Sequence, residues 1–299
     1  MQKSSEGLGD DELAIRFHDR SLNIKKELGN RLGEAASLGN LGNVYRNRGD
    51  IKRAIDYYKQ HHEIAQGFGD RQGEATSLGN LGNAHHDLEE YERAIELHKD
   101  SLKIKREIFD RPGEATSIGN QGNAYYSMEE YDRASELYQQ SLAIHREVGD
   151  RQGESTFLGN LGLVYCAQGK YEQAIYLHQQ HHQIAYEIGD RKGEAASLGN
   201  LGIAYLELGN IKLTIEKLHQ QSKIAQEIGY RQSEVISLSN LGDAYRKLGK
   251  IELARQHFQD AHNLSQTLQQ PHFAKICEQN LAELNKVNGV IVRLRHFLC

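Results

Sequence analysis

The stretch that decides the fold is residues 69–108, GDRQGEATSLGNLGNAHHDLEEYERAIELHKDSLKIKREI, which recurs with variations along most of the chain. Its opening phrase returns every forty residues without insertion, at positions 29, 69, 109, 149, 189 and 229. Within the stretch, apolar and small residues such as Ala75, Leu78, Leu81 and Gly82 recur at three- and four-residue steps, which is the spacing of one helical face. Each unit is therefore predicted to be a helical hairpin, and stacked hairpins predict a solenoid.

Signals for helix starts and stops stand at the borders between the units. Aspartates occupy the N-cap position of the first helix at Asp70, Asp110, Asp150 and Asp190. Glycines suited to the end of the preceding helix come directly before three of them, at Gly69, Gly149 and Gly189. These signals for helix starts and ends therefore agree with the forty-residue periodicity.

The two ends of the chain depart from the complete unit. Residues 11–28 correspond only to a second helix, and residues 271–288 correspond to a lone first helix that would cap the last hairpin. The solenoid is thus predicted over residues 11–288, as six complete hairpins between two half repeats. Residues 1–10 form an N-terminal tail, and the C-terminal tail 289–299 is a cap strand, a docking peptide or an expression remnant.

Composition favours a long helical protein that binds other proteins. The 299 residues include only two prolines, so helices can run almost throughout. A net charge of -5 argues against nucleic acid as a partner. Three widely spaced cysteines fit free thiols in a reducing compartment, and no stretch resembles a signal peptide or membrane span. A cytoplasmic location without membrane contact is expected.

The repeat also resembles a known family. Leu78, Leu81, Gly82, Ala94 and the tyrosines equivalent to His85 follow the spacing of the tetratricopeptide signature. The phrases GDRxGEA and SLGNLGNAY resemble the long-repeat arrays of LGN/Pins adaptors and of cyanobacterial multi-repeat signalling proteins. This resemblance implies an all-α, right-handed superhelix whose inner groove, lined by the first helices, holds an extended or partly helical peptide. No GoLoco-like segment follows the array, so spindle orientation is not implied.

Two rows of asparagine lie along the first helices. The first row is unbroken and contains Asn40, Asn80, Asn120, Asn160, Asn200 and Asn240. The second lies three residues further on, hence on the same face, and contains Asn43, Asn83 and Asn123 before changing to Leu163, Ile203 and Asp243. An asparagine amide offers donors and an acceptor, and such rows resemble the asparagine ladders that grip peptide backbones. They are predicted to bind the partner peptide, the alternative being bonds to neighbouring helices.

Selectivity is predicted to come from groove positions that vary between units. By helical spacing these are Arg46, His86, Tyr126, Cys166, Leu206 and Arg246. The cationic pair, Arg46 and Arg246, would bind acidic groups of the partner, and Tyr126 would contribute an aromatic contact. The alternative for the arginines is solvation.

Two glycines also recur within the first helices. An interior helical glycine costs about 1 kcal/mol relative to alanine, so the missing side chains must serve a purpose. For Gly42 and its equivalents we expect tight packing against the second helix. For Gly39 and its equivalents, room for a ligand and close packing are both open.

Charged and imidazole side chains favour structure over chemistry. Arginines at the start of each first helix, such as Arg71, are expected to reach a carboxylate of the adjacent hairpin in an ion-pair ladder. His98 and His178 stand where Tyr58 and Tyr138 stand in other units, which indicates packing. No metal or cofactor site, P-loop, GxSxG elbow or dinucleotide fingerprint is present, so an enzyme is not expected.

The sequence therefore predicts a protein-binding scaffold or adaptor, with a signalling role as a variant. The alternative is a structural array that self-assembles through its ends or its C-terminal tail. A monomer or a weak homo-oligomer is expected in solution.

Overall fold

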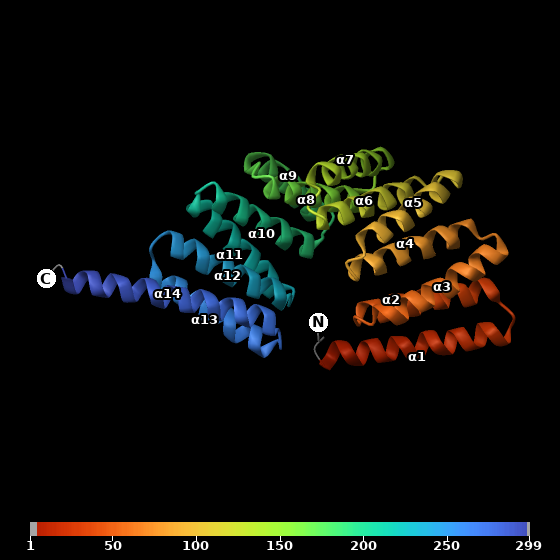
Figure 1. Ribbon diagram of the computed structural model, residues 1–299, viewed down its shortest axis with the longest axis horizontal. Helices are drawn as coiled ribbons and strands as arrows, with labels where there is room; N and C mark the ends of the chain where they lie inside the picture. Colours follow the sequence, from red (N-terminus) through yellow and green to blue (C-terminus); the bar gives the residue numbers. More distant parts are fainter. Residues whose placement is uncertain (1–4, 298–299) are drawn as a thin grey trace. The chain divides into compact units, whose positions relative to one another are not determined.

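The computed structural model describes the backbone of residues 5–297 and the side chains of residues 11–285. The predicted all-α fold is confirmed, with 14 helices and no strand in this part of the chain (Figure 1). The helices are α1 Ser5–Glu27, α2 Arg31–Asn47, α3 Ile51–Phe68, α4 Arg71–Asp87, α5 Tyr91–Glu107, α6 Arg111–Ser127, α7 Tyr131–Val148, α8 Arg151–Ala167, α9 Tyr171–Glu187, α10 Arg191–Glu207, α11 Ile211–Glu227, α12 Arg231–Lys247, α13 Ile251–Thr267 and α14 Pro271–Phe297.

The chain divides within α8 into two compact units, with the border between Phe157 and Leu158. In the first unit each helix from α1 to α7 packs on the next, and the first helices α2, α4 and α6 also contact one another in turn. The second unit repeats this order from α9 to α14, with α10 touching α12. Each unit is therefore a stack of hairpins whose first helices lie side by side.

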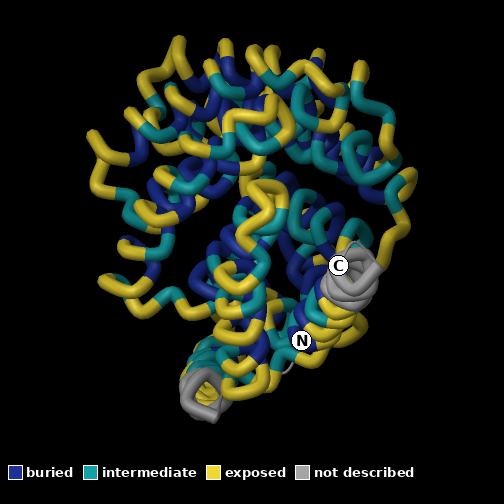
Figure 2. Tube along the Cα trace, turned by 90° about the vertical axis from the view of Figure 1, so that its left-hand side faces the viewer, coloured by how far each residue is buried: buried dark blue, intermediate teal, exposed yellow. Residues whose placement is uncertain are grey.

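The hairpin core forms where the second helix presses a large side chain against a glycine of the first. Tyr58 of α3 is completely buried, and a Cβ placed on Gly42 would lie 2.4 Å from its ring. The same contact recurs at Gly82 with His98, Gly122 with Tyr138, Gly162 with His178, Gly202 with Leu218 and Gly242 with Phe258. The packing predicted for this glycine row is confirmed. Buried positions recur along the helices from α2 onward, while the turns are mostly exposed (Figure 2).

The predicted helix caps are also present. The side chain of Asp70 accepts a hydrogen bond of 2.9 Å from the backbone N–H of Gly73, and Asp110, Asp150 and Asp190 do the same at their helices. Gly69, one of the predicted helix-ending glycines, adopts a left-handed φ of 66°. Capping by aspartate satisfies a backbone donor that a helix start leaves unpaired.

The ion-pair ladder is present, but its connections differ from the expected ones. Arg71 pairs with Glu74 and with Glu107, and Glu107 belongs to its own hairpin rather than to the adjacent one. Adjacent hairpins are joined instead from the end of a second helix, where Arg106 reaches the buried Glu114 at 2.8 Å. Arg146 and Glu154 repeat this contact at the same distance. The end of each second helix lies beside the start of the next hairpin. An arginine at that end, rather than one at the start of a first helix, therefore reaches the carboxylate of the adjacent hairpin.

Hydrogen bonds hold these buried carboxylates in the charged form. Burial raises the pKa of Glu114, but the bonds from Arg106 and Arg111 outweigh this effect and keep the pKa below its ordinary value. A buried carboxylate with two guanidinium partners is well compensated. The ladder therefore connects the hairpins without leaving a buried charge unpaired.

The two end helices present different surfaces. On α1, Leu13, Phe17 and Ile24 are exposed, whereas Tyr57 and Ile64, the equivalents of Phe17 and Ile24, pack against α2 in the next unit of the repeat. The side of α14 that corresponds to a hairpin contact is polar or small instead.

On that side of α14, Glu278 and Asn285 replace the leucine and tyrosine found at Leu78 and Tyr45, and both are exposed. This polar face suits a capping helix. The helix continues to Phe297, past the predicted end at residue 288. Most of the predicted tail 289–299 thus has a helical backbone rather than a strand, while its side chains lie outside the described residues. The predicted N-terminal tail 1–10 is also helical from Ser5 onward, where α1 begins.

Two neighbouring glycines of α4 provide a test of the hairpin contact. A Cβ on Gly82 would lie 2.6 Å from the ring of the buried His98, whereas a Cβ on Gly79 would meet only the Ser101 hydroxyl at 3.7 Å. We expect Gly82→Ala to lower the free energy of unfolding by about 1–3 kcal/mol through overpacking. Gly79→Ala should raise it by up to about 1 kcal/mol through helix propensity.

The measurement is urea unfolding of both variants followed by circular dichroism. In a His98→Ala background Gly82→Ala should cost less than in the wild type, because the smaller side chain removes the overlap. Equal effects of the two alanine substitutions would contradict this account of the core.

Candidate functional site

Neighbouring first helices bring asparagines of the first row together in pairs, Asn40 with Asn80 and Asn200 with Asn240. Between α2 and α4 lies a pocket of about 310 Å³, here called the α2–α4 pocket, lined among others by Asn40, Asn43, Asn80 and Asp70. Its remaining polar lining comes from glutamine, threonine and a histidine of α3. The predicted asparagines of neighbouring hairpins thus line one hollow, together with the apolar side chains of Leu32, Ala35 and Ala36.

In the second unit, α10 and α12 enclose a smaller pocket of about 170 Å³, the α10–α12 pocket. Asn200 and Asn240 line it, together with the apolar side chains of Ile203 and Ile236. Its lining is therefore more apolar than that of the α2–α4 pocket. The change of character that the sequence indicates at Ile203 is visible here as an aliphatic wall.

Members of the first asparagine row differ in their bonding. Among the described residues, the side chains of Asn40, Asn80 and Asn200 have no hydrogen-bond partner, and Asn240 has a buried Nδ2 that is unpaired. Asn120 accepts a long bond of 3.4 Å from the Asn123 amide. Asn160 is not free. Several amides of this row are therefore available to a ligand.

The second row is partly used inside its own hairpins. The hydroxyl of Tyr58 donates to Asn43 Oδ1 at 2.7 Å, and Tyr138 donates to Asn123 Oδ1 at 2.8 Å. Asn83 has no such bond, because the buried imidazole of His98 takes the place of the tyrosine. The alternative role, bonding to a neighbouring helix, thus applies to Asn43 and Asn123.

The two predicted groove arginines are paired within the chain. Arg46 of α2 forms a two-pronged contact with the Asp87 carboxylate of α4, with distances of 2.5 and 3.2 Å. Arg246 of α12 contacts Asp243 at 2.6 Å and Glu283 of α14 at 2.9 Å. Neither is simply solvated. An acidic partner would have to compete with these carboxylates.

Tyr126, which is predicted to provide an aromatic contact, belongs to the row of variable groove positions on the first helices. Tyr126 is half-buried, and its ring lies 5.7 Å from that of Tyr131. His86, at the equivalent position in α4, approaches the Ser127 hydroxyl at 3.0 Å. These contacts hold the two rings on the first helices α4 and α6.

Side chains from the second helices occupy most of the space beside Gly39 and its equivalents. A Cβ on Gly39 would lie 2.9 Å from His61, and the same applies to Gly159 with His181. Gln221 crowds Gly199 in the same way, whereas Gly119 is crowded by Phe157 of α8, itself a first helix. Only Gly79, of those described, has ordinary clearance. Close packing, rather than a ligand, explains four of these five glycines.

This row of second-helix side chains escaped the sequence reasoning. It comprises His61, Ser101, Ser141, His181, Gln221 and Ala261. The forty-residue spacing shows the row, but helical periodicity alone assigns it to the interior. Only the three-dimensional structure shows that His61 and Gln221 also line the pockets between first helices.

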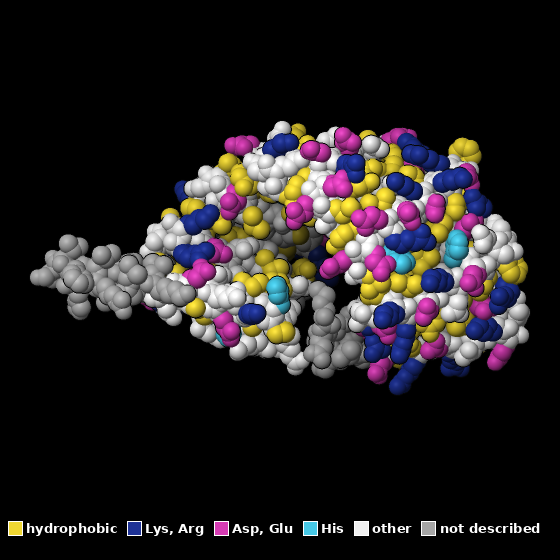
Figure 3. Space-filling model, in the orientation of Figure 1, with side chains coloured by type: hydrophobic (Ala, Val, Ile, Leu, Met, Phe, Trp, Pro, Cys, Tyr) yellow, Lys and Arg dark blue, Asp and Glu magenta, His cyan; other side chains and the backbone are white. Residues whose placement is uncertain are grey.

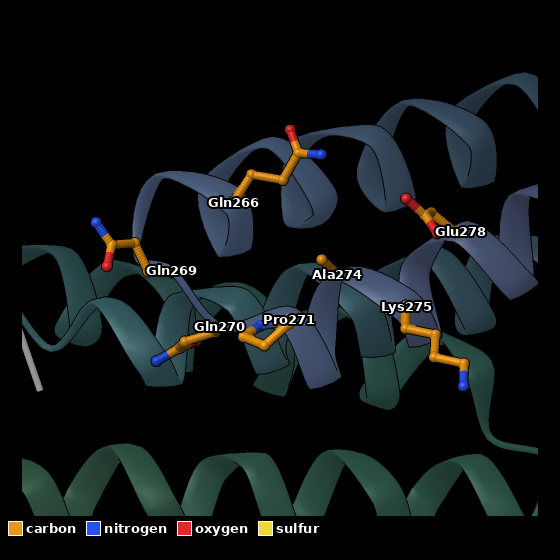
Figure 4. Close-up of a pocket in the computed structure, with 7 residues that line it drawn as sticks. All are labelled: Gln266, Gln269, Gln270, Pro271, Ala274, Lys275 and Glu278. Carbon is orange, nitrogen blue, oxygen red and sulfur yellow. The ribbon is translucent and has the colours of Figure 1, made fainter. Parts of the chain in front are cut away.

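A further hollow lies away from the asparagine rows, at the connection between α13 and α14. Its volume is about 660 Å³, and Figure 4 shows its lining residues, with Gln266 on α13 and Ala274, Lys275 and Glu278 on α14. None of the predicted groove residues lines it. On the face of the molecule in Figure 3, basic and acidic side chains are intermixed, so no one-sign surface stands out there (Figure 3).

Buried histidines are held in the neutral form. Burial lowers the pKa of His98 to about 4, that of His178 to about 3 and that of His181 to about 4. At least one ring nitrogen of each has no hydrogen-bond partner. Within the described part of the chain, no three His, Cys, Asp or Glu side chains are grouped to hold a metal ion. The packing role predicted for His98 and His178 is confirmed by their burial.

These imidazoles predict a loss of stability in acid. The unfolded chain binds a proton at the ordinary histidine pKa of about 6.5, while folded His98 resists protonation down to about 4. The contribution of His98 to the free energy of unfolding is therefore fully present above about pH 6.5. It decreases as the pH drops towards 4, by about 3 kcal/mol for this one group. His98→Phe, which places the residue found at Phe258, should remove that share of the pH dependence.

The measurement is urea unfolding at about pH 7 and pH 4. The matched control is His272→Phe, at an exposed position, which should keep the wild-type dependence. An unchanged pH dependence in His98→Phe would contradict the burial argument.

Comparisons with known proteins agree with this geometry. The sequence matches the tetratricopeptide repeat family over residues 6–67, 45–107, 73–147, 153–216 and 194–267. No curated protein matches the chain in sequence. Within the described residues, no helix is both long and apolar enough to cross a membrane.

Three solved structures illustrate the shared fold. A signal transduction ATPase with numerous domains and a tetratricopeptide repeat sensor, from Pyrococcus horikoshii, has a TM-score of 0.75 and 20% identity, covering 92% of this chain and 41% of that one. BtubC from P. vanneervenii has a TM-score of 0.65 and 18% identity, covering 73% and 92%. A Rap protein complexed with competence and sporulation factor has 0.65 and 18%, covering 87% and 72%. At these identities the likeness shows the fold alone.

Proposed function

Because the chain belongs to the tetratricopeptide repeat family, we propose that it is a protein-binding scaffold whose first helices hold an extended or partly helical peptide of its partner. Solenoids of this kind use the surface along their stacked repeats for binding. The observation that carries the proposal is the unpaired state of Asn40, Asn80 and Asn200 beside the pockets. Amides left open on neighbouring hairpins suit the donors and acceptors of a peptide backbone.

The rest of the asparagine surface supports the same role. Asn120, Asn160 and Asn240 continue the first row, and Asn43, Asn83 and Asn123 lie one turn further along the same helices. Asn43 and Asn123 use Oδ1 within the hairpin. Because these two side chains are held within the hairpin, they would orient the asparagine surface rather than supply most of the affinity for the peptide.

Variable side chains would add selectivity to this backbone contact. Tyr126 offers an aromatic edge, while Arg46 and Arg246 would exchange their internal carboxylates for acidic groups of the partner. A related use of the fold is seen in the Rap protein, which was solved in complex with competence and sporulation factor. Signalling through a bound factor is a variant of the same proposal.

A protein-binding scaffold needs no catalytic group, and the cysteine thiols are poorly suited to nucleophilic catalysis. Burial raises the pKa of the Cys166 thiol to about 11, and burial likewise raises that of Cys277. Neither is a ready nucleophile, since the thiolate is the reactive form. Tetratricopeptide proteins are generally scaffolds rather than enzymes.

The test compares two triple variants as bait for partners from the source lysate. Asn40→Ala/Asn80→Ala/Asn200→Ala should lose the partner by about tenfold or more, because several backbone bonds of about 1 kcal/mol each are removed. Its helical signal should stay intact, since alanine favours helix over asparagine. The matched control is Asn23→Ala/Asn47→Ala/Asn263→Ala, which alters three exposed asparagines outside this row. Equal recovery by the two triple variants would refute the proposed groove.

A second candidate function is self-association through α1. The observation that favours it is the exposed apolar face of α1, where Leu13 is 52%, Phe17 64% and Ile24 46% exposed. A second copy of the chain would cover that face, whereas the polar side of α14 argues against head-to-tail growth within residues 271–285. One helix face gives a small contact, so association should be weak.

Light scattering over a concentration series tests this candidate. The apparent mass should rise with concentration in the wild type and stay monomeric in Phe17→Glu, because a charge in the apolar contact is costly. Tyr176→Glu is the control, since Tyr176 of α9 is equally exposed at 64%. A wild type that remains monomeric at the highest concentration would end the idea. The contribution of the segment 289–299 to assembly stays a prediction.

A further inference from the structure

The α10–α12 pocket contains two buried polar atoms without partners. Gln221 of α11 is only 4% exposed, yet its Oε1 accepts no hydrogen bond. Asn240 of α12 has a buried Nδ2 that donates none. Both side chains line the same pocket of about 170 Å³. One unpaired acceptor and one unpaired donor therefore share a small hollow.

The Gln221 amide is fixed in place by its surroundings. Its Nε2 donates to the Ser233 hydroxyl at 3.1 Å. A Cβ on Gly199 would lie within 2.7–2.9 Å of all three atoms of the amide group, so the missing side chain of Gly199 is what lets the amide reach this position. The unpaired oxygen cannot leave the pocket lining without breaking this arrangement.

Leaving such groups unpaired is costly, at about 1–3 kcal/mol for each buried donor or acceptor. A primary carboxamide carries the two complementary groups, an N–H that can donate to Gln221 Oε1 and a carbonyl that can accept from Asn240 Nδ2. A carboxylate offers no donor to the Gln221 oxygen, and a thioether offers neither donor nor a strong acceptor.

The walls of the pocket fit the remainder of such a side chain. Ile203 and Ile236 supply aliphatic contacts, and Tyr230 adds an aromatic one. The pocket is several times larger than the roughly 30 Å³ that a water molecule takes up in the liquid. It therefore has room for an apolar stem that carries a polar head.

We propose that the α10–α12 pocket is a subsite for a glutamine or asparagine side chain of the bound partner, with Gln221 and Asn240 as its specificity-determining residues. The proposal rests on the peptide-binding function proposed above and deepens it. The subsite is particular to this hairpin, because the residues equivalent to Gln221 are histidine, serine or alanine in the other units. At the α2–α4 pocket the equivalent residue is His61.

The experiment selects a random twelve-residue peptide display library against three forms of the full chain. These are the wild type, Gln221→Met and Gln220→Met. Methionine matches the length of glutamine but lacks the amide, and Gln220 is the exposed neighbour on the same helix, which makes it the matched control. Gln221→Ala, with the residue found at Ala261, serves as a second variant should the methionine disturb folding.

The expected result is enrichment of glutamine or asparagine at one peptide position with the wild type and Gln220→Met, and loss of that enrichment with Gln221→Met. A selected peptide should bind Gln221→Met about tenfold more weakly, in line with a lost buried hydrogen bond. Selected peptides without any preference for a carboxamide would overturn the subsite while leaving groove binding in place.

A second measurement keeps the subsite testable apart from the groove. N-acetylglutamine amide is titrated into the labelled protein, and the side-chain amide signals of Gln221 and Asn240 are followed by nuclear magnetic resonance. Selective shifts with this probe, absent with N-acetylglutamate amide and N-acetylmethionine amide, are expected. No shift, or equal shifts with all three probes, would overturn the subsite. A library that yields no peptide at all would count against the proposed function instead.

Discussion

The close approach of the two helices in each hairpin is the contact on which the rest of the structure depends. It exists because glycines such as Gly42 leave space that Tyr58 fills completely. The same contact occurs with tyrosine, histidine, leucine or phenylalanine in successive hairpins. This hairpin contact requires a large buried side chain opposite a glycine. Hydrogen-bonding capacity is secondary, since His178 is buried there with both ring nitrogens unpaired.

The same contact determines what the binding surface can offer. Where the second helix contributes a tyrosine, as at Tyr58, its hydroxyl emerges beside the first helix and bonds Asn43. Where it contributes His98, the asparagine beside it, Asn83, is left without that bond. The core residue of one helix thus decides whether an amide on the other helix is occupied. Variation in the core is in this way transmitted to the surface.

The glycine row formed by Gly39 and its equivalents likewise connects the interior of the hairpins with their surface. Gly39 and Gly199 admit side chains of the second helices, His61 and Gln221, into the lining of pockets between first helices. Such residues are buried like core positions but vary like binding positions. They give the α2–α4 and α10–α12 pockets different linings within the same repeat.

The sequence by itself determined the helical hairpins, their forty-residue spacing, the aspartate caps and the packing of Gly42 and His98, because each follows from short-range periodicity and local chemistry. It also placed the asparagine rows on one helical face. It did not determine which amides are free, that Arg46 and Arg246 are paired within the chain, or that Gln221 lines a pocket. Those facts depend on contacts between residues tens of positions apart. Only tertiary packing brings such residues within hydrogen-bonding distance, so only the structure could decide them.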